Sequence, residues 1–197
     1  MTTPLPDAAL DRLFRDGRSY NGYLDRPVGD DQLHAIWDLM KWGPTSANML
    51  PARLVWCTSE AAKASLAACM GEPNAGKVRA APATVIIAMD LDFADHLPDL
   101  FPHADAASWF AGNEPLIHAS AFRNSSLQGA YLILAARALG LDSGPMSGFD
   151  PAAVDTAFFA DSPRVKTNFI ATLGYGDPAS IFERLPRPAF ERFNRIT

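Results

Sequence analysis

The chain has 197 residues, of which 48% are hydrophobic and 20% are charged, a composition typical of a compact domain rather than of a disordered or fibrous chain. Its 17 lysines and arginines against 22 aspartates and glutamates give a formal net charge of −5, so it lacks the basic excess on which non-specific nucleic-acid binding depends. We therefore expect one domain over residues 1–197 that binds neither DNA nor RNA.

The cysteines and the apolar runs indicate where the protein works. Cys57 and Cys69 form no C-x-x-C pair, have no histidines at zinc-ligand spacing and are too few for a disulfide framework, so we expect a reducing cytoplasm and no metal site. The segment 1–15 lacks the features of a signal peptide. The longest apolar run, 80–89, is about half of the ~20 residues that cross a bilayer, so no membrane segment is expected.

Two amphipathic helices are expected at the start of the chain. Asp7 is placed to cap the first helix and Gly17 to end it. The second helix is expected to begin at Asp30 or Asp31 and to end before a loop over residues 43–51. Four apolar residues of this second helix recur at helical spacing: Leu33, Ile36, Trp37 and Met40.

The rest of the chain predicts an α+β layout. Three segments rich in β-branched and aromatic residues read as strands: 53–58, 83–90 and 166–173. The middle one is apolar on both faces and is therefore expected to be central. Three further helices are expected: 59–70, 113–139 and 151–159. The tail 182–197 has no core of its own, so a fourth strand is expected from a partner chain.

The long helix over 113–139 has a stripe of small and apolar residues, which suits close packing in a core or across a dimer interface. The stripe consists of Leu127, Ala130, Tyr131, Leu134, Ala135 and Ala138.

The residue patterns of simple hydrolases and of nucleotide-binding loops are missing from the sequence. In G-P-M-S-G over 144–148 the serine is fourth rather than third, so the nucleophile-elbow motif is not met. The histidines at 34, 96, 103 and 118 are scattered and match no metal motif. Polar loops without an evident acid, base or nucleophile are typical of proteins in which a bound cofactor performs the chemistry.

Seven segments carry a resemblance to a known family, in the right order along the chain. They are K-W-G-P-T-S-A-N over 41–48, P-A-R over 51–53, F-P-H over 101–103, S-W-F over 108–110, A-F-R-N-S-S over 121–126, G-P-M-S-G-F-D over 144–150 and G-Y-G-D over 174–177. The chain thereby resembles the nitroreductase family of flavoproteins, and within it the malonic semialdehyde reductases of pyrimidine degradation. The resemblance implies a mostly antiparallel sheet flanked by helices, in a homodimer with two FMN sites at its interface.

The resemblance also implies which residues hold the FMN phosphate and ribityl chain. The family's first motif falls on Arg18, Ser19 and Asn21, and Asn21 stands where the family has a second basic residue. Arg184 and Arg187 of the tail match a basic pair and would supply the remaining positive charge. A guanidinium suits this task because its planar fork donates two charge-assisted hydrogen bonds to a phosphate.

Two further segments are implied to contact the flavin ring. The loop with Pro44, Thr45, Ser46 and Asn48 resembles the family segment that reaches the flavin of the other subunit, and it also reads as the turn that ends a helix. Asn74 and Lys77 match, less distinctly, residues at the pyrimidine edge of the ring, where a cation would stabilise the anionic reduced flavin. Lys77 otherwise reads as a solvated lysine before a strand.

The segment 144–148 is implied to contact the reactive side of the flavin. Pro145 and Met146 would lie against the ring, and the backbone N–H of Ser147 or Gly148 would point at flavin N5. The same residues otherwise read as a plain loop between two helices, ahead of a helix capped by Asp150.

The implied reaction is hydride transfer from NADH or NADPH through FMN to a small electrophile, without a side-chain acid or base. Malonic semialdehyde, reduced to 3-hydroxypropionate, is the expected acceptor. Its carboxylate needs a cation, and Arg123 is the candidate, although such an arginine is as often a structural partner of an acidic neighbour. The alternatives are a broad-range reductase of nitroaromatics, quinones or enones, and a flavin-binding dimer without turnover.

Overall fold

The computed structural model describes residues 3–197 and has one four-stranded sheet in the order β1-β2-β4-β3, with every neighbouring pair antiparallel. The strands are β1 (Ala52–Cys57), β2 (Ala83–Asp90), β3 (Asp142–Met146) and β4 (Val165–Gly174). Every residue of β2 is buried. The prediction of a central strand at this place is therefore confirmed.

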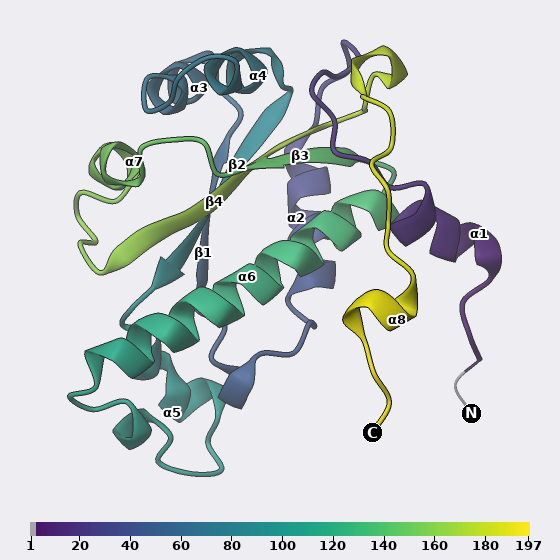
Figure 1. Cartoon of the computed structure of the whole chain (residues 1–197). Helices are drawn as coiled ribbons and strands as arrows, with labels where there is room; N and C mark the ends of the chain where they lie inside the picture. Colours follow the sequence, from purple (N-terminus) through teal and green to yellow (C-terminus); the bar gives the residue numbers. More distant parts are fainter. Residues whose placement is uncertain (1–2) are drawn as a thin grey trace.

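Helices cover both faces of the sheet (Figure 1). On one face, α2 (Asp30–Met40) and α6 (Glu114–Ala138) pack against the strand residues that include Val85 and Ile87. On the other face, α3 (Glu60–Ala67), α4 (Asn74–Ala80) and α7 (Pro151–Phe158) pack against a set that includes Ile86. Successive side chains of a strand point to opposite faces of the sheet, so β2 contributes side chains to both cores.

Short elements complete the described chain. They are α1 (Asp7–Leu10) with a π-helical turn at Asp11–Arg15, α5 (Leu97–Leu100), α8 (Phe190–Phe193) and 3-10 turns at Ser46–Asn48, Phe93–His96, Ala107–Trp109 and Pro178–Ser180. Residues 93–110 enclose a third, smaller core in which the rings of Phe93 and Phe110 meet edge to face, with centroids 4.8 Å apart. Within residues 3–197, no helix is long and apolar enough to cross a membrane.

One helix start follows the predicted capping, and two do not. The side chain of Asp150 accepts backbone N–H groups of the first turn as predicted, and Ser59 and Asn113 cap α3 and α6 in the same way. The expected caps Asp7 and Asp30 or Asp31 are wrong, because Pro6 and Gly29 occupy the N-cap positions. The aspartates lie one or two residues further on, inside the first turn, where a negative charge still interacts favourably with the helix dipole.

The prediction that a fourth strand comes from a partner is wrong, because β3 supplies it within the chain. Its sequence, D-S-G-P-M, has low intrinsic strand preference. Pairing with β4 holds it extended, with Gly144 opposite Thr172. A Cβ on Gly144 would lie 2.3 Å from the carbonyl oxygen of Tyr20, so the N-terminal loop packs directly on this strand.

The long helix occurs where expected, but its buried side differs from the predicted stripe. Of that stripe only Ala135 is buried, and Leu127 is 40% exposed. The buried side instead includes the polar residues Asn124 and Gln128, together with Gly129. A Cβ at Gly129 would lie 2.3 Å from the ring of Phe169, so this glycine lets α6 approach the sheet.

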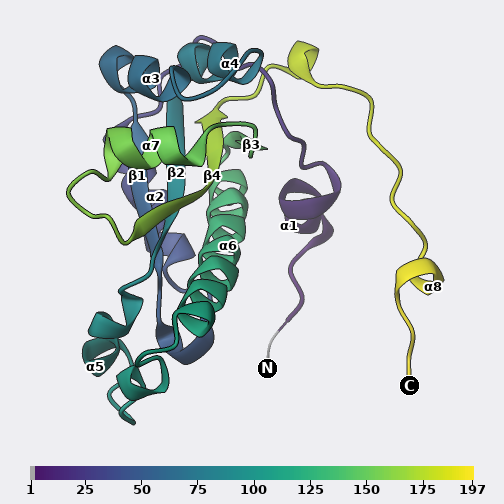
Figure 2. The same cartoon turned by 60° about the vertical axis from the view of Figure 1, so that its left-hand side comes forward.

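The C-terminal segment leaves the body of the molecule. From Phe182 onward every residue is exposed, and Figure 2 shows α8 lying apart from the sheet and its helices. Phe182, Phe193 and Ile196 are 79%, 70% and 92% exposed. This segment therefore offers large apolar side chains that nothing in the described chain covers.

Candidate functional site

The N-terminal loop and the start of the tail meet at one end of the sheet. The Arg18 guanidinium donates to the carbonyl oxygen of Phe182, and the amide of Asn21 donates to that of Ser180 over 3.1 Å. Arg184 donates back to the carbonyl of Gly17 over 3.3 Å. The structure thus brings Arg184 of the tail to the loop with Arg18 and Asn21, although more than 160 positions separate it from them in the sequence.

Ser19 connects this loop to β3. Ser19 forms an isolated bridge with Ser143, and the N–H of Tyr20 donates to the carbonyl oxygen of Ser143 over 3.0 Å. The hydroxyl of Ser143 is buried and has no hydrogen-bond partner within residues 3–197. Burial, and then the nearby Asp142 carboxylate, raises the pKa of Tyr20.

Two further hydroxyl groups, those of Tyr23 and Thr172, lie next to β3. The hydroxyl of Tyr23 lies 2.8 Å from that of Thr172, and the Thr172 hydroxyl is 3.3 Å from the carbonyl oxygen of Gly144. Burial raises the pKa of Tyr23 far above its ordinary value. This tyrosine is therefore a neutral hydroxyl that fixes the loop to the sheet.

The residues predicted to contact the flavin ring, Asn74 and the segment 145–148, lie at the other end of β3. The side-chain amide of Asn74 donates to the carbonyl oxygen of Gly148 over 3.0 Å, so α4 is tied to the segment after β3. In the described part of the chain, the backbone N–H groups of Ser147 and Gly148 donate to no other group. Both residues are exposed, and these two donors are therefore available to a ligand.

Pro145 and Met146 form the end of β3, and Lys77 lies on α4. The interpretation of 144–148 as a loop between two helices is wrong, because its first residues are in a strand. Lys77 is half-buried on the helix α4 rather than fully solvated. This short helix is stabilised locally, since the Glu72 carboxylate accepts the N–H of Gly76 over 3.0 Å.

The loop with Pro44, Thr45, Ser46 and Asn48 has an unusual backbone. Ala47, Asn48 and Leu50 have φ values of 47°, 48° and 39°, a region that costs free energy for residues other than glycine and is often found at functional sites. The loop is held by the Thr45 hydroxyl, which accepts the N–H of Leu50 over 3.2 Å, and by Asn48, which donates to the carbonyl of Leu100 over 2.8 Å.

This loop does not meet the other predicted residues within one chain. Two further hydrogen bonds join it to α6, where Tyr131 donates to the carbonyl of Pro44 over 2.9 Å and Asn124 accepts the N–H of Ser46 over 2.9 Å. The loop leads into β1, whose first residue, Ala52, pairs with Met89 at the end of the sheet opposite to Asp142 and Gly174.

Sequence reasoning missed the buried amides of α6 as residues that position this loop. Asn124 is fully buried, and its amide also donates to the carbonyl of Ser120 over 2.9 Å. Gln128, equally buried, accepts the N–H of Ala52 over 2.8 Å. For Asn124, the polar run A-F-R-N-S-S could have indicated this role, because an amide on the buried side of a helix needs a hydrogen-bond partner in another element.

The remaining predicted residues, Arg123 and Arg187, are exposed. Arg123 lies on α6 and forms no ion pair with any residue in 3–197. The alternative interpretation of Arg123, as the partner of an acidic neighbour, is therefore wrong for this chain. Arg187 contacts the carbonyl oxygens of Leu185 and Pro186 within the tail.

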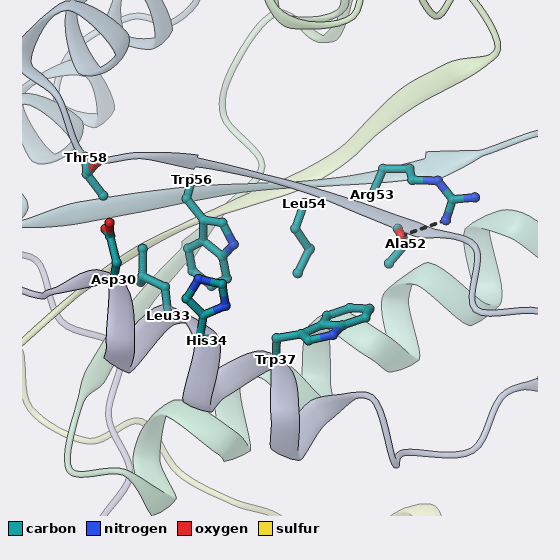
Figure 3. A pocket seen from close by; sticks show the side chains of 9 residues that line it. All are labelled: Asp30, Leu33, His34, Trp37, Ala52, Arg53, Leu54, Trp56 and Thr58. Atoms are coloured by element: carbon teal, nitrogen blue, oxygen red, sulfur yellow. Dashed lines mark hydrogen bonds between the residues drawn. The ribbon is translucent and has the colours of Figure 1, made fainter.

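A hollow of about 580 Å³ lies between α2 and β1. Figure 3 shows His34 and Trp37 reaching from α2 towards Trp56 and Leu54 of β1, with Arg53 at one end. None of the predicted cofactor-binding residues lines it. It is therefore separate from the groups described above within one chain. Across residues 3–197, no cluster of side chains is suited to hold a metal ion.

Comparisons with known proteins identify relatives over the whole chain. Residues 14–175 match the model of the nitroreductase family. The chain is 60% identical over 194 residues to a Burkholderia lata protein named "Putative NADH dehydrogenase/NAD(P)H nitroreductase", covering 98% of this chain and 99% of that protein.

Solved structures share the fold. A Bacillus subtilis nitroreductase structure has a TM-score of 0.88 at 22% identity and covers 98% of this chain and 100% of its own. A structure from Exiguobacterium sibiricum, solved in complex with FMN, has a TM-score of 0.86 at 20% identity and covers 100% of both chains. The antiparallel four-stranded sheet flanked by helices is the fold of these proteins.

Proposed function

Because the chain belongs to the nitroreductase family, we propose that it is an FMN-dependent oxidoreductase that takes electrons from NADH or NADPH. The observation that carries this proposal is that β3 connects two of the groups predicted to bind the flavin. Ser143 contacts the loop with Arg18 and Ser19, and the free N–H groups of Ser147 and Gly148 follow the strand. From Ser143 to Ser147, four residues of extended chain span roughly 13 Å.

The residues at both ends fit the chemistry of FMN. At one end, Arg18 and Arg184 provide guanidiniums for a phosphate, beside a buried Ser143 hydroxyl without a partner in 3–197. At the other end, a Cβ on Gly148 would come within 2.7 Å of the Asn74 amide nitrogen, so only a bare backbone lets Asn74 reach its carbonyl. The exposed N–H groups there can donate to a ring nitrogen.

Each group has a distinct task in this proposal. When bound, FMN supplies reversible two-electron chemistry, so that hydride passes from the nicotinamide to an electrophile. Arg18, Ser19, Asn21, Arg184 and Arg187 bind the phosphate end. The backbone of Ser147 and Gly148 orients the ring, and Pro145 and Met146 support it. Lys77 places positive charge near the ring edge, where negative charge develops on reduction.

We further propose that two copies of the chain form a homodimer in which each completes the other's site. The tail supports this, since its large apolar side chains are exposed from Phe182 to Ile196. The outer side of α6 adds Phe122 and Leu127, which are 50% and 40% exposed. The loop with Ser46 and Asn48 lies far from Arg18 within one chain, as expected if it serves the flavin of the second copy.

For the acceptor, we propose malonic semialdehyde, reduced to 3-hydroxypropionate in pyrimidine degradation. Arg123 supports this substrate, because it is exposed and forms no ion pair within 3–197. A free guanidinium can bind the carboxylate of the substrate. The competing proposals are a broad-range reductase of nitroaromatics, quinones or enones and a flavin-binding dimer without turnover. We place the protein in the cytoplasm, since Cys57 and Cys69 are both free and buried.

The purified protein tests the central proposal directly. We expect the absorbance of bound oxidised flavin and release of FMN on denaturation. Under anaerobic conditions, NADH or NADPH should bleach that absorbance, and malonic semialdehyde or a quinone should restore it. A protein that binds no flavin after incubation with excess FMN contradicts the proposal. Bound flavin that neither nucleotide bleaches supports the non-catalytic alternative.

A further inference from the structure

Four arginines gather where the N-terminal helical segment, the end of α6 and the tail meet: Arg12, Arg18, Arg137 and Arg184. Arg12 donates to the carbonyl oxygen of Arg137 over 2.9 Å, and Arg137 donates to that of Leu13 over 2.7 Å. Arg184 donates to the carbonyl of Gly17 over 3.3 Å. Two of the four, Arg12 and Arg137, have no place in the phosphate site that the sequence predicts.

The positive charge of this cluster is only partly compensated. Arg12 lies 3.4 Å from the carboxylate of Asp142, and within residues 3–197 no other acidic side chain pairs with any of the four. Burial lowers the pKa of Arg137, Asp142 raises it, and the positive charges of Arg12 and Arg184 lower it further. Like charges held this close repel one another, so a bound anion lowers the free energy of the cluster.

Arg137 lies directly beneath the turn that presents Arg18. A Cβ on Gly17 would come within 2.5 Å of the guanidinium carbon of Arg137, so the backbone of this turn packs on the guanidinium itself. The Nε–H of Arg137 is buried and has no acceptor in the described chain. Arg137 therefore contributes its charge from behind the turn, while Arg18 and Arg184 lie on the side of the tail.

We infer that Arg12 and Arg137 form a second layer of positive charge behind Arg18 and Arg184, and that this layer makes the site select a flavin that carries a phosphate over one that does not. The inference rests on the proposed FMN function. A phosphate monoester carries about −1.5 to −2 charges at neutral pH, so it gains from a charge that it does not touch. Arg137 is thus a positioning and specificity residue, with no contact to the reacting atoms.

The test compares the dissociation constants of FMN and riboflavin, which differ only in the phosphate, on flavin-free protein. Arg137→Gln removes the charge and, because glutamine is shorter, also the donor to the Leu13 carbonyl, a loss that affects both flavins alike. We expect FMN binding to weaken about tenfold and riboflavin binding to change less than about twofold, because only FMN carries the charge that Arg137 attracts. Arg137→Lys, which restores the charge, should recover most of the FMN affinity. The FMN affinity of the unchanged protein should fall with salt more steeply than that of Arg137→Gln.

Arg164→Gln is the matched control, because it removes the same charge far from the arginine cluster. Arg164 directly precedes β4, and the opposite end of β4 pairs with Asp142, which lies beside the cluster. This control should leave both affinities unchanged. Arg12→Gln should shift the FMN affinity in the same direction as Arg137→Gln. It replaces Arg137→Gln in the test if that variant fails to fold. Equal weakening of FMN and riboflavin, or an unchanged ratio in both variants, overturns the inference. An unchanged protein that binds neither flavin overturns the proposed function instead.

Discussion

The amide nitrogen of Asn74 lies 3.0 Å from the carbonyl oxygen of Gly148, and a Cβ at position 148 would approach that same nitrogen to 2.7 Å. The hydrogen bond therefore depends on glycine. It joins α4, which carries Lys77, to the two free N–H groups after β3. This one hydrogen bond thus fixes how far Lys77 lies from the N–H groups of Ser147 and Gly148, and these are proposed to bind the flavin ring from different sides.

Gly148→Ala should weaken FMN binding roughly tenfold, the equivalent of one lost hydrogen bond, because the added methyl group pushes Asn74 away. Fluorescence titration of flavin-free protein measures this change. Gly71→Ala is the control, since nothing lies within 4 Å of a Cβ at that position. If Gly148→Ala binds FMN as tightly as Gly71→Ala does, the contact between Asn74 and Gly148 does not shape the site.

Arg18→Ala should release FMN while the protein stays folded, because the substitution removes a guanidinium from the phosphate end and the donor to the Phe182 carbonyl. A charge-assisted hydrogen bond is worth about 1.5–3 kcal/mol, so the affinity should fall by at least tenfold. Flavin content after gel filtration measures the loss. Arg26→Ala provides the comparison, since Arg26 lies over the ring of Tyr175 at 3.6 Å and has no bond to the tail. Equal flavin content in both variants would remove Arg18 from the site.

The sequence predicted those elements whose local pattern agrees with their environment. The 3.6-residue spacing of α2, the strand β2 with apolar residues on both faces and the long helix α6 were all correct. It missed β3, because D-S-G-P-M becomes a strand only by pairing with β4. It also missed α4, whose seven residues are too few to be stable alone. In both cases contacts distant in sequence override a weak local preference.

The same limit applies to the candidate site. Short motifs marked Arg18, Asn74 and Gly148, yet spacing alone could not show that the tail reaches Arg18 or that α4 reaches Gly148. A related limit applies to the stripe on α6, of which only Ala135 packs in the core of one chain. Hydrophobicity favoured leucine, alanine and tyrosine residues for the buried side, whereas the structure buries Asn124 and Gln128, because they hydrogen-bond the loop and the strand beside them.

Mixed dimers should show that each site draws on two chains. An Asn48→Ala chain and an Arg18→Ala chain each form homodimers with two damaged sites. If each site takes Arg18 from one chain and Asn48 from the other, the mixed dimer has one site with both substitutions and one site with neither. We expect half of the normal flavin content, measured by absorbance on dimers purified with two different affinity tags. No recovery in the mixed dimer would place both residues in the same chain's site.

Cys57 should be unreactive at neutral pH. Its side chain is fully buried, and burial raises the pKa of its thiol from the ordinary 9.0 to about 11. The neutral thiol is therefore favoured in the folded state, and its contribution to stability is complete below pH 9 and is lost as the pH rises from about 9 to 11. Mass spectrometry after iodoacetamide treatment at pH 8 should find Cys57 unmodified in folded protein and alkylated in denaturant. Equal alkylation in both states would contradict this burial.

The last prediction concerns the acceptor, and it depends on Arg123. Reduced flavins pass hydride readily to quinones and nitro groups, whereas an aldehyde needs its carbonyl polarised and its position fixed by donors. An exposed arginine without an ion pair in the described chain can hold the carboxylate of malonic semialdehyde but offers nothing to a neutral quinone. Arg123→Gln should therefore lower kcat/KM for the aldehyde by about tenfold to a hundredfold, the range of one or two charge-assisted hydrogen bonds.

The quinone provides the internal control for this substitution. Its kcat/KM should change less than about twofold in Arg123→Gln, because the flavin and its nicotinamide donor are untouched, and Arg123→Lys should restore part of the aldehyde activity through its charge. Steady-state rates for both acceptors on the same preparations make the comparison. Equal losses for both acceptors would mean that Arg123 acts on the flavin site as a whole. If the unchanged enzyme reduces quinones and leaves the aldehyde untouched, the broad-range reductase replaces the semialdehyde reductase.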